Sequence, residues 1–205
     1  MIDQFFLGGV SFCRSIVGII VKPYETYRKI VDRGSMVELV FIVFLLFFYF
    51  AIASIVKTAA FRPFFLTKHL LLLSGTSALT YVISVTLLWQ IGKTIGGRGN
   101  LRGFIVAWGY TLVPTVTWFL CTSILYVILP PPRTTSVAGI VFSVLFLVFS
   151  TTLLFWKITL AYLTLRFGLH LDLLKIFIVT SIVGPLIGLY SIWMFQMGIF
   201  KVPFL

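Results

Sequence analysis

Long apolar segments separated by short polar connectors occupy most of the chain. Each segment reaches the roughly 20 residues that an α-helix needs to cross a hydrocarbon layer about 30 Å thick. The connectors, among them AAFRPFFLTKH, PPPRTTS and FGLHLD, are short, and no soluble domain interrupts the segments. The pattern predicts an all-α membrane protein, a bundle of five transmembrane helices at about residues 36–57, 70–93, 103–129, 137–165 and 173–199.

The first of two amphipathic segments before the spans covers residues 4–21. Its apolar side chains share one helical face, while Ser11, Arg14 and Ser15 lie toward the other. This is the pattern of a helix that lies in the membrane interface. The Gly8-Gly9 pair predicts a break in it, and a short spanning helix is the alternative for the segment.

A second surface helix is predicted in the sequence KPYETYRKIVDR, because Pro23 suits the first position of a helix. Ser35 and Glu38 then form the Ser-x-x-Glu pattern of a capping box, which begins the first span. We therefore divide the chain into one or two interfacial helices in residues 1–34 and the five-span domain in residues 35–205.

Composition agrees with a membrane protein. Hydrophobic residues make up 60% of the chain and charged residues only 10%, whereas a soluble domain carries about 25% charged residues. The formal charge is +11, from 16 Lys and Arg against 5 Asp and Glu. In a multi-pass protein, such an excess indicates basic loops that face the cytoplasm and anionic lipid headgroups. No segment resembles a nucleic-acid-binding module, so we do not expect a nucleic-acid partner.

The basic residues divide unequally between the two sides of the five predicted spans. One side carries Lys57, Arg62, Lys68, Arg133 and Lys201. The other carries Arg14, Lys22, Arg28, Lys29, Arg33, Lys93, Arg98, Arg102, Lys157, Arg166 and Lys175. The positive-inside rule predicts a cytoplasmic N-terminus and an external C-terminus, in the plasma or inner membrane if the chain is prokaryotic.

Groups that carry out catalysis are scarce in the predicted spans. Their interiors contain no Asp or Glu apart from Glu38 at an edge, and the motifs of metalloproteases, serine hydrolases and phosphate-binding loops are missing. His69 and His170 lie in or beside connectors without carboxylates to complete a metal site. We predict no catalytic, metal or cofactor site and no enzymatic activity.

Two charged residues fall within or at the edge of apolar segments. Lys157 is either a buried cation that pairs with Glu38 or with carbonyls and lines a cavity, or the end of a fourth span that stops beside Trp156. Glu38 is explained by helix capping, with an intramembrane pair to Lys157 as the functional alternative.

Prolines and small residues in the spans predict kinks and close contacts. Pro114 and Pro185 remove a backbone hydrogen bond and predict kinks in the third and fifth spans. Gly184 and Gly188 have the G-x-x-x-G spacing of close helix packing, either within the chain or in a homodimer. The small residues 74–78, SGTSA, offer a similar surface for a neighbouring helix.

The turn GGRGNLRG is predicted to lie on the cytoplasmic side, with Gly96 or Gly97 ending one helix and Asn100 capping the next. Its arginines and the proline-tyrosine helix are candidates for binding anionic lipid headgroups or an acidic partner protein. The candidate residues are Lys22, Tyr24, Tyr27, Arg98 and Arg102. The alternative is that the arginines serve only to set the topology.

Three segments together resemble the Ypt/Rab-interacting (Yip) family of membrane proteins. They are KPYETYRKI, GGRGNLRGFIVAWGYTLVP and WKITLAYLTLRFGLHLDLLKIFIV, and the similarity runs from about residue 22 to 185. The resemblance implies a five-span bundle with a cytoplasmic N-terminus and no catalytic residues. Eukaryotic relatives act in vesicle traffic and bind small GTPases. This chain resembles the compact bacterial and archaeal branch, which is sometimes associated with ABC-type exporters.

The leading hypothesis is a non-enzymatic membrane scaffold or adaptor. Its cytoplasmic surface, formed by residues 22–33, 94–103 and 166–175, would dock a protein partner or shape the bilayer. The alternative is a small transporter or channel, or an accessory subunit of an ABC-type export system, with a path along Lys157 and Glu38.

Overall fold

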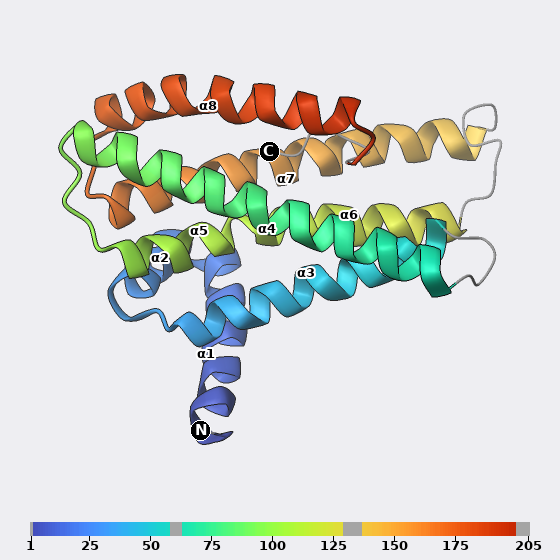
Figure 1. The fold of residues 1–205 in the computed structure, drawn as a ribbon, viewed down its shortest axis with the longest axis horizontal. Coiled ribbons are helices and arrows are strands. Elements are labelled where there is room, and N and C mark those ends of the chain that lie inside the picture. The colour runs from blue at the N-terminus through green and yellow to red at the C-terminus, as the bar shows by residue number, and fades with distance from the viewer. Residues whose placement is uncertain (1, 58–62, 129–136, 200–205) are drawn as a thin grey trace.

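The computed structural model describes residues 2–57, 63–128 and 137–199, and these form α-helices and connectors without a β-strand (Figure 1). The all-α prediction is therefore confirmed. The helices are α1 (Ile2–Val21), α2 (Pro23–Arg33), α3 (Met36–Lys57), α4 (Pro63–Thr94), α5 (Leu101–Tyr110), α6 (Leu112–Ile128), α7 (Val137–Gly168) and α8 (Leu173–Gln196).

Five segments of the described chain are long and apolar enough to cross a membrane, which confirms the predicted number of spans. They are Met36–Ile55, Thr67–Thr94, Leu101–Leu125, Gly139–Gly168 and Leu173–Gln196. The first helix of the five, α3, has the predicted bounds. The second, α4, begins earlier than predicted because Pro63 takes its first position, where a proline costs no hydrogen bond.

The third predicted span consists of two helices that meet at Thr111. Pro114 has no N–H for the Tyr110 carbonyl four residues earlier, and its ring crowds that carbonyl. The chain tightens instead, because the Thr111 N–H and Oγ1 both donate to the Trp108 carbonyl, at 3.0 and 2.7 Å. The predicted kink at Pro114 thus takes the form of a break, whereas α8 continues through Pro185.

Helix α1 lies across the long axis of the bundle, along which the long helices run (Figure 1). It is continuous from Ile2 to Val21, so the predicted break at Gly8-Gly9 is wrong. These glycines allow close packing instead, because a Cβ on Gly8 would lie 2.5 Å from Val37 Cγ1 of α3. A helix that lies in the membrane interface would cross a bilayer-spanning bundle in this direction. The interfacial placement of α1 stays a prediction.

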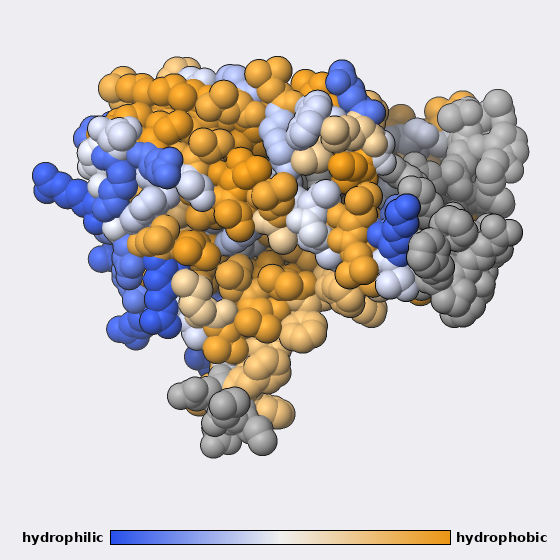
Figure 2. All heavy atoms as spheres, in the orientation of Figure 1, coloured by the Kyte–Doolittle hydropathy of each residue, from blue (hydrophilic) through white to orange (hydrophobic). Residues whose placement is uncertain are grey.

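The most complete burial is found where α2, α5 and the end of α7 meet. One core cluster surrounds Tyr27, Tyr110 and Leu160, and a second surrounds Phe104 and Leu169. The long helices expose large apolar side chains over the middle of the molecule, while hydrophilic residues gather at the end where α2 lies (Figure 2). This distribution is typical of a bundle with a lipid-facing flank and a wetted end.

Candidate binding surface

The polar end of the molecule is built from three segments that lie far apart in the sequence: α2, the α4–α5 turn with α5, and the α7–α8 turn. Their main chains approach one another closely. The Arg98 N–H donates to the Leu169 carbonyl at 3.0 Å. A Cβ on Gly99 would lie 1.5 Å from the Gly168 carbonyl oxygen, and one on Gly103 would lie 2.3 Å from the Val31 carbonyl oxygen. Only glycine fits at positions 99 and 103, because any Cβ would overlap with these carbonyl oxygens.

Both ends of the α4–α5 turn have the predicted structure: a glycine after α4 and an asparagine cap before α5. Gly96 adopts a left-handed φ of 99° after α4 ends. The Asn100 side chain caps α5 by accepting a hydrogen bond from the Arg102 N–H at 3.1 Å. Both predictions for this turn are confirmed, and together they fix the direction in which its two arginines leave the main chain.

Exposed basic side chains cover this end of the molecule, and we call the set the basic face. Its members are Lys22, Arg28, Lys29, Arg33, Lys93, Arg98 and Arg102. Glu25 and Asp32 are exposed among them, so the face is mixed but predominantly positive. Tyr24 is also exposed there, and its ring packs edge-on against Phe167 of α7. Of the five predicted binding residues, four are therefore on the surface.

The fifth, Tyr27, is a correction to the sequence-based prediction. Its side chain is 0% exposed, and with Ile30 and Val31 it forms the face of α2 that packs against α5 and α7. Tyr27 is therefore a core residue and cannot reach a lipid headgroup or a partner. Burial raises the pKa of its hydroxyl above the ordinary value, and the neighbouring Thr164 hydroxyl offsets part of that rise.

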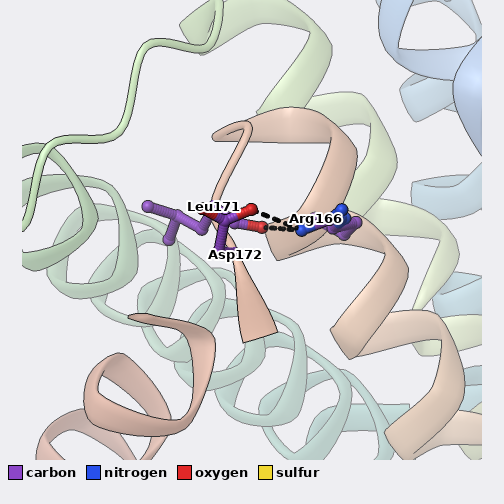
Figure 3. Close-up of polar contacts among 3 residues, drawn as sticks. All are labelled: Arg166, Leu171 and Asp172. Atoms are coloured by element: carbon purple, nitrogen blue, oxygen red, sulfur yellow. Dashed lines mark hydrogen bonds and ion pairs between the residues drawn. The ribbon is translucent and has the colours of Figure 1, made fainter. Parts of the chain in front are cut away.

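The α7–α8 turn is held by one arginine (Figure 3). Arg166 Nη1 donates to the Leu171 carbonyl at 3.0 Å and pairs with Asp172 Oδ1 at 2.9 Å. His170 between them adopts a left-handed φ of 54°. Because the Asp172 side chain is 80% exposed, the ion pair itself contributes at most about 1 kcal/mol. The bond to the carbonyl closes the turn on the end of α7.

Glu38 is buried at the start of α3 and accepts hydrogen bonds from three elements. It completes the predicted capping box, because Oε1 accepts from the Ser35 N–H at 3.3 Å and the Ser35 hydroxyl accepts from the Val37 N–H at 3.2 Å. The hydroxyl of Tyr110 donates to Oε2 at 2.5 Å, and that of Ser11 donates to Oε1 at 2.9 Å. Glu38 thus ties α1 and α5 to the beginning of α3.

A groove of about 840 Å³ separates α1 from α2 and adjoins the basic face. Four basic residues line it, together with Glu25 and the buried Glu38: Arg14, Lys22, Lys29 and Arg33. The groove extends the predominantly positive surface toward the exposed apolar side chains of α1, such as Val17 and Val21. A surface of this kind suits contact with anionic headgroups.

Lys157 lies within α7, which continues beyond it to Gly168. Its Nζ donates to Thr115 Oγ1 of α6 at 3.0 Å. The predicted pair with Glu38 is not formed, because the Glu38 carboxylate accepts from the three donors described above and from the Ser15 hydroxyl at 3.5 Å. Lys157 instead lines a separate cavity of about 230 Å³ between the long helices.

Among the described residues, the predicted glycine contacts of α8 are not formed. A Cβ added at Gly184 or Gly188 would meet nothing within 4 Å, and the same holds for Gly75 in the small-residue segment of α4. The prediction of packing through these glycines is therefore wrong for the part of the chain that the structure describes. Contact with a second copy of the chain stays a prediction.

The model of the Yip1 domain matches residues 17–195 of this chain. This range includes α2, both turns of the polar end, the first four long apolar segments and the fifth up to Phe195. The chain belongs to the Yip1 domain family. With its five apolar segments, it is an integral, multi-pass membrane protein. Neither the search of the curated proteins nor that of the solved structures gave a match.

The Yip1 domain family is not known for an enzymatic activity. Within the part of the chain that the structure describes, no group of three or more His, Cys, Asp or Glu side chains is placed to hold a metal ion. The described polar groups form caps, turns and the basic face, and we assign none of them a catalytic role.

Several residues around Glu38 and Lys157 could not be named from the sequence. Ser11 and Ser15 were placed on the polar face of α1, but nothing in the pattern indicated that this face meets Glu38. Tyr110 and Thr115 lie in an aromatic, apolar run that gives no sign of which side faces a charge. The useful signal is the i,i+4 pair of serines, Ser11 and Ser15, beside the apolar stripe of α1.

Proposed function

We propose that this Yip1 domain protein is a non-enzymatic membrane scaffold whose basic face docks an acidic partner protein at the cytoplasmic surface of the membrane. The observation that carries the proposal is the rigid assembly of the face. Three distant segments are fixed to one another by main-chain contacts at Gly99, Gly103 and Arg98. The main chain that carries the charged side chains is thereby held in a defined arrangement, which favours a specific surface over a diffuse basic loop.

The alternative of a transporter requires a continuous polar path along Glu38 and Lys157. Glu38 lines the groove between α1 and α2, whereas Lys157 lines the cavity between the long helices. Glu38 and Lys157 therefore do not line one continuous path, and this favours the scaffold over the transporter.

The scaffold is tested by photo-crosslinking in native membranes from position 101, where the Leu101 side chain is exposed between the two arginines. Arg98→Gln with Arg102→Gln is expected to reduce the yield of protein adducts at least about tenfold, since a close charge pair across a protein–protein interface contributes about 1.5 kcal/mol or more. Arg98→Lys with Arg102→Lys retains the charges and is expected to retain most of the adducts.

Lys68→Gln is the matched control, because Lys68 is exposed near the opposite end of the bundle. It should leave the adducts unchanged. Equal adduct yields from the wild-type chain and the Arg98→Gln, Arg102→Gln chain would contradict docking on the basic face, as would an equal loss in Lys68→Gln.

A further inference from the structure

The cavity that contains Lys157 lies in the lipid-embedded part of the bundle. It has a volume of about 230 Å³ and is lined by α3 and α4, by the α5–α6 junction and by single residues of α7 and α8. An apolar cavity of about 150 Å³ already accommodates a benzene ring. This one has room for a small polar group and several methylenes.

The cavity opens toward the bilayer between α3 and α4. Val43 and Phe47 of α3 and Val82 of α4 line it, and all three also expose large parts of their side chains on the lipid-facing surface. The two helices pack together around Phe50 and Leu73, near one end of the bundle. They diverge toward the other end (Figure 1), and residues of both helices line the cavity.

Polar groups are placed within this largely apolar space. Ser74, Ser77 and Ser84 of α4 line it, and so does the ammonium-bearing Lys157. The hydroxyl oxygens of Ser74 and Ser77 are buried, and neither has a hydrogen-bond partner among the described residues. Other α4 hydroxyls behave differently: those of Thr76 and Thr80 donate to carbonyls four residues earlier. Buried hydroxyls without a partner are unfavourable unless a ligand or water satisfies them.

The charge in the cavity selects the kind of ligand. The described lining residues include a lysine and no carboxylate, so an anionic group would be favoured over a neutral or cationic one. The small volume and the apolar mouth fit one hydrocarbon chain, not the bulky headgroup and paired chains of a phospholipid.

We propose that this cavity binds a long-chain fatty acid drawn from the bilayer. The carboxylate lies at Lys157 and accepts hydrogen bonds from α4 serine hydroxyls. The alkyl chain leaves between α3 and α4 along Val43, Phe47 and Val82. The site is separate from the basic face and does not depend on the scaffold function.

The test uses the full chain in nanodiscs of neutral phosphatidylcholine, with a photoreactive palmitic acid as the probe. Labelling is expected to be saturable and to map to α3 and α4 near the mouth of the cavity. Unlabelled palmitate is expected to compete at least about tenfold better than hexadecanol, because only the acid pairs with the lysine. Labelling that does not saturate, or equal competition by the alcohol, would overturn the proposal.

Two substitutions locate the site. Lys157→Met removes the charge at similar length and is expected to weaken binding at least about tenfold. Ser77→Leu fills the cavity and is expected to abolish saturable labelling, whereas Ser181→Leu makes the same change at an exposed position of α8 and should leave it intact. Each variant is first shown to elute as a folded protein. Wild-type binding in either folded cavity variant, or an equal loss in Ser181→Leu, would refute the assignment.

Discussion

Substitution of Gly99 by alanine is expected to destabilise the protein by about 3 kcal/mol, at the upper end of the usual cost of overpacking. A Cβ at this position would lie 1.5 Å from the Gly168 carbonyl oxygen and 2.9 Å from Leu169 Cα. Both are main-chain atoms, which cannot move aside as a flexible side chain can. The α4–α5 turn would have to separate from the α7–α8 turn, and the Arg98–Leu169 hydrogen bond would be lost with it.

The measurement is the apparent Tm in a mild detergent, followed by size-exclusion chromatography of heated samples. A loss of about 3 kcal/mol corresponds to a decrease of roughly 6–12 °C for a chain of this size. Gly184→Ala is the matched control, because a Cβ there meets nothing within 4 Å. Its Tm should stay within about 2 °C of the wild-type value or rise, since alanine favours a helix interior. Equal Tm values for the two variants would show that the turns are not in close contact.

Replacement of Glu38 by alanine is expected to cost about 3 kcal/mol as well. The substitution leaves the hydroxyls of Tyr110 and Ser11 and the Ser35 N–H without their acceptor in a buried setting. Glu38→Gln retains one acceptor oxygen and is expected to cost less, about 2 kcal/mol. Glu25→Ala is the control, because Glu25 is exposed on α2, and it should change the stability by no more than about 0.5 kcal/mol.

A double-mutant cycle separates the role of Glu38 as a cap from its long-range contact. If the Tyr110 hydroxyl bonds to Glu38, the effects of Tyr110→Phe and Glu38→Ala are coupled by about 1–3 kcal/mol. If Glu38 served only as a helix cap, the two substitutions would have additive effects on stability. Additivity would contradict the contact between α3 and α5.

The number and approximate bounds of the spans could be predicted because bilayer thickness fixes the length of an apolar helix. The local turn chemistry of Gly96 and Asn100 was also predictable, since capping depends on neighbouring residues alone. The break at Thr111 was only partly foreseen. Pro114 indicated a disturbance, but its form depends on where the displaced carbonyl and amide groups find partners.

Contacts between distant segments account for the errors. Tyr24 and Tyr27 are three residues apart and share a stripe, yet α5 and α7 bury Tyr27 completely, while Tyr24 contacts Phe167 of α7 and stays exposed. The low helix propensity of Gly8 and Gly9 led to the predicted break in α1. The packing of α1 on α3 outweighs that propensity, and the helix stays continuous. Glu38 and Lys157 have opposite charges, but each contacts hydroxyl groups on other helices. Which of several partners a buried group meets depends on the tertiary arrangement.

The central claim is that the basic face lies on the cytoplasmic side of the membrane and is formed by three segments on that same side. Cysteine accessibility in sealed membrane vesicles of known orientation tests it most directly. After Cys13 and Cys121 are replaced by serine, single cysteines are introduced by Arg28→Cys, Arg98→Cys, Asp172→Cys and Lys68→Cys, all at exposed positions. We predict that a membrane-impermeant maleimide labels the first three only from the cytoplasmic side and the fourth only from the other side. Labelling of any of the first three from the side that labels position 68 would contradict the account.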